Sequence, residues 1–255
     1  MKKIISVFIA CFMILNSFIF VYAETNTDDE TIGSTYGGLF PERVPSAQEQ
    51  FQDFLHSKPS SKDVADVQNK INGIHEPVPS ARYGAWIYLP NTFTVIDQGK
   101  DYYCAASCVK STMNYIKGSS ESLSATYVNL QGTGQIQPGV CLARIAPYLN
   151  QEQNATRYVT RDYKVSYENM RIQLTAAINQ YQTPAIIVIK AMDGEWGYYN
   201  TAGHALSVIG AYSDQYAFYL GDPLYKIAGC PSKYAKGAGI IYNGISYESG
   251  TGYVY

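Results

Sequence analysis

The sequence predicts an α+β fold in which one helix packs against an antiparallel sheet. Residues 104–116 have the composition of a buried helix and are followed by a Lys-Gly pair that is typical of a helix end. Residues 185–189 form a continuous apolar run of strand length. Residues 204–212 and 216–220 have the pattern of two strands joined by a tight turn. Together these segments predict a helix followed by a hairpin-containing sheet.

The first 23 residues have the features of a secretory signal peptide. Lys2 and Lys3 precede an apolar run, residues 4–22, and the segment ends in Val21-Tyr22-Ala23, which fits a cleavage site. No other stretch is long and apolar enough to span a bilayer. We therefore expect a protein that is secreted to the extracellular space or the cell surface, with no membrane segment after cleavage.

An N-terminal arm, residues 24–90, precedes the predicted core domain, residues 91–255. Its first part is acidic, rich in Gly, Ser and Thr, and poor in large apolar residues, so we expect a flexible tail. Apolar residues three and four apart then predict two short helices, separated by Lys58-Pro59-Ser60-Ser61, where Ser60 or Ser61 can cap the second. The arm fits a removable propeptide and an integral flank equally well, and no cleavage signal distinguishes them.

Composition excludes several classes of function. Without Lys2 and Lys3 the chain keeps 17 of its 19 Lys and Arg residues against 21 acidic residues, a formal charge of −4, and it has no basic patch for nucleic acid. The three histidines, at positions 56, 75 and 204, are far from any CxxC spacing, so we expect no zinc site. We therefore expect no metal, no cofactor and no nucleic-acid partner.

Four cysteines remain after signal cleavage, and they bear on both chemistry and disulfides. They are Cys104, Cys108, Cys141 and Cys230. An even number in a secreted protein suggests two bridges. A nucleophilic Cys104 has to remain a thiol, which leaves at most one bridge among the other three. Among those pairs we favour Cys108 with Cys141.

Four residues have the order and types of a cysteine hydrolase site. Gln98 lies six positions before Cys104, His204 follows a hundred residues later, and Asp222 lies in a Gly-Asp-Pro turn. An imidazole held by a carboxylate can take the proton of a thiol and so create a nucleophilic thiolate. The start of one strand of an antiparallel hairpin lies beside the end of the other, so we expect His204 and Asp222 at the same edge of the sheet.

The proposed roles follow from these residue types. Cys104 is the nucleophile at the start of its helix, where unpaired backbone N–H groups favour negative charge. His204 is the base, Asp222 fixes its tautomer, and Gln98 donates to the oxyanion together with the backbone N–H of Cys104. Each residue taken alone also has a structural explanation, as a core cysteine, a core histidine or a turn. Their combination at compatible spacing favours the catalytic interpretation.

The chain resembles the papain-like cysteine peptidases of the bacteriocin-leader (double-glycine) type and their secreted relatives. The segments that carry the resemblance are Gln98-x5-Cys104-Ala-Ala-Ser, Pro184-Ala-Ile-Ile-Val-Ile, Gly203-His204-Ala-Leu-Ser-Val-Ile-Gly210 and Tyr219-Leu-Gly-Asp222-Pro223. The resemblance implies a papain-like α+β fold, with the nucleophile on a central helix and His and Asp on the facing sheet. It assigns to Cys104, His204, Asp222 and Gln98 the roles given above.

Two departures from that family limit what it implies. The family usually has Gly-Pro after the nucleophile, where this chain has Ala105-Ala106. The exporter-linked members carry a transporter and an ATPase, and this chain has neither, so we do not infer cleavage of double-glycine leaders.

Two other functions remain open from the sequence. The same triad serves acyl transfer in transglutaminase-like proteins, although their separation of Cys from His is usually shorter. A catalytically inactive surface-binding module is the other alternative, motivated by the 24 tyrosines and the missing Gly-Pro. For a peptidase, in contrast, we expect a protein or peptide as the substrate.

Overall fold

The computed structural model describes residues 43–56, 59–76, 84–132, 139–155, 157–192 and 194–255. The predicted signal peptide and most of the predicted tail lie outside these ranges. The helices are α1 Ala47–His56, α2 Ser61–Asn72, α3 Cys104–Ile116, α4 Leu123–Gln131, α5 Leu142–Gln153, α6 Tyr167–Asn179, α7 Tyr225–Ala228 and α8 Ala238–Ile245. The strands are β1 Trp86–Tyr88, β2 Thr160–Asp162, β3 Ala185–Ala191, β4 Thr201–Tyr212, β5 Ala217–Gly221, β6 Lys233–Gly237 and β7 Gly252–Val254. None of the described helices is long and apolar enough to cross a bilayer.

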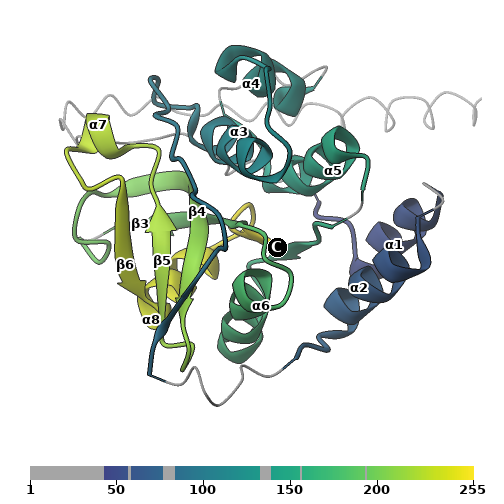
Figure 1. The fold of residues 1–255 in the computed structure, drawn as a ribbon. Helices are drawn as coiled ribbons and strands as arrows, with labels where there is room; N and C mark the ends of the chain where they lie inside the picture. Colours follow the sequence, from purple (N-terminus) through teal and green to yellow (C-terminus); the bar gives the residue numbers. More distant parts are fainter. Residues whose placement is uncertain (1–42, 57–58, 77–83, 133–138, 156, 193) are drawn as a thin grey trace, which may run out of the picture. The chain divides into compact units, whose positions relative to one another are not determined.

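The described strands form one antiparallel sheet. Their order is β2-β7-β3-β4-β5-β6, and β1 pairs with the far end of β4 (Figure 1). The predicted hairpin is β4 and β5, which pair from Ser207 with Gly221 to Ala211 with Phe218. Strand β3 is buried on both faces for nearly all its length, as its continuous apolar run predicts. The predicted combination of helices with an antiparallel sheet is thus confirmed.

Helices cover both faces of the sheet, and the alternation of side chains along β3 shows this. Ile186 and Val188 pack in a cluster with residues of α3, α4 and α5. Ile187 and Ile189 pack in a second cluster with residues of α6 and α8. Because successive side chains of a strand point to opposite faces, the two clusters lie on opposite sides of β3. Figure 1 shows α3, α4 and α5 gathered together.

The N-terminal arm contains the two predicted helices and also contributes to the sheet. Ser60 caps α2, its hydroxyl accepting from the backbone N–H of Asp63, as the sequence predicts. Strand β1 pairs with β4 in register Trp86 with Tyr212 and Tyr88 with Gly210. The sheet therefore extends upstream of residue 91, where the core domain was expected to begin.

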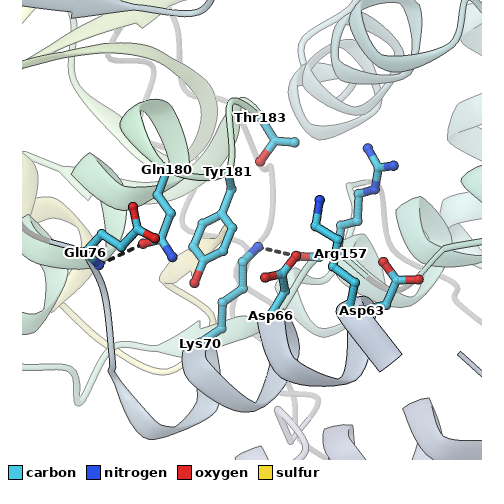
Figure 2. Close-up of a pocket in the computed structure, with 9 residues that line it drawn as sticks. Asp63, Asp66, Lys70, Glu76, Arg157, Gln180, Tyr181 and Thr183 are labelled. Carbon is cyan, nitrogen blue, oxygen red and sulfur yellow. Dashed lines mark hydrogen bonds between the residues drawn. The ribbon is translucent and has the colours of Figure 1, made fainter. Parts of the chain in front are cut away.

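Helix α2 is fastened to the rest of the chain through Lys70. Its ammonium is buried, donates to the backbone oxygen of Arg157, and lies 4.3 Å from the ring centroid of Tyr181 (Figure 2). It also lies 5.2 Å from the ring centroid of Tyr255. Burial lowers the pKa of Lys70 to about 7. The Tyr255 hydroxyl donates to the backbone oxygen of Lys70 at 2.8 Å, so the last residue of the chain holds this helix.

Helix α1 supplies a second attachment. The side-chain amide of Gln50 donates to the oxygen of Thr160 and accepts from its N–H at 2.8 Å, which covers the outer edge of β2. Phe54 is buried in the cluster that also contains Val159. These contacts make α1 and α2 part of the packed core.

Replacement of Phe54 tests whether this arm is integral. We expect Phe54→Ala to lower the free energy of unfolding of the whole chain by about 3 kcal/mol, since it empties a buried ring site. The matched control is Leu55→Ala in the same helix, where the side chain is exposed and the effect is expected within about 0.5 kcal/mol. Urea denaturation gives both values. A core transition unchanged by Phe54→Ala would show that the arm is an independent appendage.

Candidate active site

Cys104 is the first residue of α3, as the sequence predicts. The preceding Tyr103 makes no side-chain capping bond to this helix. The N–H groups of the first helical turn lack partners within the helix, and they give this end partial positive charge. The Cys104 side chain is fully buried, so its sulfur lies in a medium where that charge is poorly screened.

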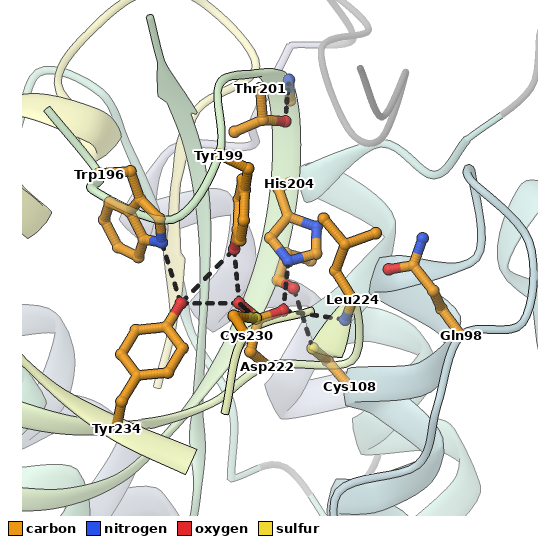
Figure 3. Close-up of polar contacts among 12 residues, drawn as sticks. Gln98, Cys108, Trp196, Tyr199, Thr201, His204, Asp222, Leu224, Cys230 and Tyr234 are labelled. Carbon is orange, nitrogen blue, oxygen red and sulfur yellow. Dashed lines mark hydrogen bonds and ion pairs between the residues drawn. The ribbon is translucent and has the colours of Figure 1, made fainter. Parts of the chain in front are cut away.

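The β4–β5 hairpin brings His204 to Asp222. His204 lies near the start of β4, and Asp222 follows the last residue of β5 directly. Nε2 of His204 lies 2.9 Å from Oδ1 of Asp222, and both side chains are fully buried (Figure 3). The predicted pairing at one edge of the sheet is what the hairpin produces.

The contact with Asp222 assigns the hydrogen positions of His204. A carboxylate only accepts hydrogen bonds, so Nε2 carries a hydrogen. Nδ1 is buried and makes no hydrogen bond of standard geometry with the described residues. The side chain of Cys104 acts on this imidazole and raises its pKa. Nδ1 is therefore the nitrogen available to hold the proton of the thiol.

Electrostatic interactions favour the charged forms of His204 and Asp222. Burial lowers the pKa of His204, but the carboxylate of Asp222 and the thiol of Cys104 outweigh burial and raise it to about 9. Burial raises the pKa of Asp222, and its hydrogen-bond donors together with His204 bring it below its ordinary value. Below pH 6.5 the raised pKa of His204 stabilises the fold fully, and this stabilisation is lost as the pH rises through about 9.

Asp222 is surrounded by hydrogen-bond donors. Oδ1 accepts from His204 and from the backbone N–H of Leu224 at 2.9 Å. Oδ2 accepts from the hydroxyls of Tyr199 at 2.5 Å and Tyr234 at 2.7 Å, and the thiol of Cys230 lies 3.7 Å away. Figure 3 shows these side chains converging on the carboxylate from different segments. A buried carboxylate needs such donors to remain ionised.

Gln98 is held between α3 and the turn that carries Asp222. Its backbone N–H donates to the oxygen of Pro223 at 3.0 Å. The side chain is buried, and Nε2 donates to the backbone oxygens of Lys100 at 2.9 Å and Asp101 at 3.1 Å. Oε1 is buried without a partner among the described residues. Both hydrogens of the Gln98 side-chain amide are thus donated to backbone carbonyl groups. The role of Gln98 as an oxyanion donor stays a prediction.

The remaining cysteines do not form the bridge that we favoured. Cys104, Cys108 and Cys230 are free thiols, so the pairing of Cys108 with Cys141 is wrong. Cys108 lies one helical turn beyond Cys104 and donates instead to the backbone oxygen of Ala205 at 3.3 Å. Burial raises the pKa of Cys108 well above its ordinary value. Such a thiol is inert, in contrast to one paired with an imidazole.

Sequence reasoning missed the partners of Asp222. Tyr199 and Tyr234 come from a loop and from β6, and no local pattern links them to the Gly-Asp-Pro turn. Trp196, in the loop before His204, is a packed indole: it is fully buried, and its Nε1 donates to the Tyr234 hydroxyl at 2.9 Å.

Comparison with known proteins supports the fold. No family model matches the chain, and no curated protein matches its sequence. Among solved structures it is similar to xylellain, a cysteine protease from Xylella fastidiosa, with a TM-score of 0.51 and 12% sequence identity. The match covers 89% of this chain and 98% of that one. The chain thus shares its α+β fold with a cysteine protease. This confirms the predicted papain-like α+β class.

The raised pKa of His204 can be measured directly. We expect Asp222→Asn to lower the imidazole pKa from about 9 to below its ordinary value near 6.5, since burial then dominates. Asp214→Asn, in the turn of the same hairpin, is the control and should leave this pKa unchanged. NMR titration of histidine-labelled protein reports it. An unchanged value in Asp222→Asn would contradict the ion pair.

Proposed function

We propose that this protein is a secreted cysteine peptidase that hydrolyses peptide bonds through Cys104, His204 and Asp222. The observation that carries the proposal is the buried contact of His204 Nε2 with Asp222, which leaves Nδ1 for the Cys104 proton. The positions of Cys104 at the start of a helix and of His204 and Asp222 on a strand pair are compatible with the fold that this chain shares with a cysteine protease. The signal-peptide pattern of residues 1–23 supports the secretory part of the proposal.

The reaction that this arrangement supports has two stages. Nδ1 of His204 takes the proton of Cys104, and the thiolate attacks the carbonyl carbon of a peptide bond. The imidazolium then gives its proton to the leaving amine, which leaves an acyl group on the sulfur as a thioester. Water, deprotonated by His204, attacks the thioester and releases the acid. Asp222 keeps the imidazole in one orientation and stabilises its positive charge in both stages.

The oxyanion of each tetrahedral intermediate needs donors near the sulfur. The backbone N–H of Cys104 is one, at the start of α3. The side-chain amide of Gln98 becomes the second when it turns one N–H from a backbone carbonyl toward the substrate. The backbone bond of Gln98 to Pro223 keeps this residue beside the Asp222 turn. Because Cys104 is fully buried, the atoms that cover its side chain have to move before a polypeptide can reach the sulfur.

Removal of the thiol tests the proposal. We expect Cys104→Ala to reduce hydrolysis of fluorescein-labelled denatured casein to the level of a blank, because Cys104 is the thiol that acts on the His204 imidazole. Cys108→Ser is the matched control, since a hydroxyl also donates to Ala205, and it should retain activity within a few fold. Casein cleavage by Cys104→Ala at the wild-type rate would refute the peptidase. Addition of glycine ethyl ester separates the alternative, because an acyl-transfer enzyme then gives more amide than free acid.

Replacement of Gln98 tests the oxyanion donor separately. We expect Gln98→Ala to lower kcat on casein by about 10² to 10³. Alkylation of Cys104 by iodoacetamide, followed by mass spectrometry, forms no oxyanion and should proceed at the wild-type rate. A variant that loses both activities would instead show that Gln98 positions α3, and one that loses neither would remove it from the mechanism.

A further inference from the structure

A network of aromatic side chains surrounds the far oxygen of the Asp222 carboxylate. Oδ2 accepts hydrogen bonds from the hydroxyls of Tyr199 and Tyr234 (Figure 3). The Tyr234 oxygen in turn accepts a hydrogen bond from the indole N–H of Trp196. All three aromatic residues are at most 7% exposed. None of them belongs to the Cys-His-Asp set, so the reaction scheme above leaves their role unassigned.

The hydrogen positions in this network follow from its chemistry. An indole N–H only donates, so the Tyr234 oxygen accepts from Trp196 and its own hydrogen is directed to Asp222. The Oδ2 distances of 2.5 and 2.7 Å lie in the range of O–H···O⁻ bonds to an ionised acceptor. On Oδ1 the backbone N–H of Leu224 is also a donor only. The carboxylate is thus met by donors on both oxygens.

We propose that Tyr199 and Tyr234 are positioning residues that hold Asp222 ionised and in the orientation that His204 requires, with Trp196 fixing the direction of the Tyr234 hydroxyl. The proposal rests on the peptidase function above for its catalytic consequence, although the state of Asp222 can be observed without turnover. A carboxylate pinned at Oδ2 cannot rotate Oδ1 away from His204, and a buried one keeps its charge only while donors replace water.

Several titratable groups face Asp222 and determine its protonation. They come from β4, the loop before it, the segment before β6, β6 itself and α3, and they are His204, Tyr199, Cys230, Tyr234 and Cys108. Burial and the nearby carboxylate raise the pKa of both tyrosines and of Cys230, so these three remain protonated donors across the working pH range. His204 is the one partner in this set that carries charge near neutral pH.

The expected effect of losing a hydroxyl has a definite sign. The donors lower the pKa of Asp222, so Tyr199→Phe and Tyr234→Phe should each raise it, by about one pH unit. As the pH falls, the carboxylate is then neutralised earlier and His204 loses its counter-charge. The acid limb of kcat/KM should therefore move to higher pH in both variants, with kcat reduced about tenfold and KM unchanged.

The experiment compares these variants with Tyr198→Phe. Tyr198 lies in the same loop, is exposed, and touches the ring of Tyr234 at 4.7 Å between centroids without a bond to Asp222. NMR of histidine-labelled protein follows the His204 Nε2 resonance, which moves when Asp222 is protonated. We expect the acid step of that resonance to shift upward in Tyr199→Phe and Tyr234→Phe, and to stay in place in Tyr198→Phe.

A second comparison separates positioning from stability. In an Asp222→Asn background the Tyr199→Phe substitution should leave kcat and the His204 resonance without further change, because its effect acts through the carboxylate. An acid step that stays at the wild-type pH in both hydroxyl variants would overturn the proposal, and so would an equal loss of activity at every pH. If the wild-type protein cleaves no casein but the step still shifts, the peptidase proposal fails and the positioning role stands.

Discussion

The burial of one negative charge governs the design of this site. Asp222 is completely removed from solvent, and an unpaired carboxylate in that environment is penalised by several kcal/mol. The two carboxylate oxygens accept hydrogen bonds from His204, Leu224, Tyr199 and Tyr234. Leu224 belongs to the same turn as Asp222, but the other three donors come from β4, the loop before it and β6. The carboxylate therefore keeps all its donors only when these segments are packed together. The integrity of the site and of the surrounding fold are therefore coupled.

The sheet topology delivers these donors. The β4–β5 hairpin places His204 at the edge where β5 ends, and β6 pairs with β5 so that Tyr234 lies opposite Leu220, close to the turn. On the other side, the segment before α3 is tied to the turn by the bond from Gln98 to Pro223, and to α3 by the bond from Ile96 to Ser111. These two hydrogen bonds connect α3, which begins at Cys104, to the turn that follows the β4–β5 hairpin. The geometry of the site therefore follows from how consecutive elements pack.

The sequence was most informative where the signal is local. The positions of α3, the buried strand β3 and the β4–β5 hairpin follow from composition, periodicity and turn chemistry within short windows, and they suffice to bring His204 beside Asp222. The bounds of α3 are as predicted, whereas β3 ends two residues later and β4 begins three residues earlier than predicted. Strands β1 and β7 have three residues each, too short for any alternating pattern to identify, and they are defined only by their partners in the sheet. The cysteine count likewise gave the wrong bridge, because arithmetic does not show which thiols pack apart.

The details of the site depend on tertiary contacts that no spacing reveals. No sequence feature shows that Tyr199, five residues before His204, donates a hydrogen bond to Asp222 rather than lying at the surface. The neighbouring Tyr198 is in fact exposed. The orientation of the Gln98 amide is set by the carbonyls of Lys100 and Asp101 after the loop has folded. The contact of His204 with Asp222 was therefore predictable from the sequence, whereas the tyrosine donors around Asp222 were not.

The most direct test of the account is to capture the acyl group on Cys104. Wild-type protein turning over casein peptides is quenched in acid, digested and mapped by mass spectrometry. The account predicts a thioester on the peptide that contains Cys104, and no such adduct in His204→Ala, where nothing takes the thiol proton. Steady product formation by the wild type with Cys104 unmodified at every quench time, or an adduct on a different residue, would contradict it.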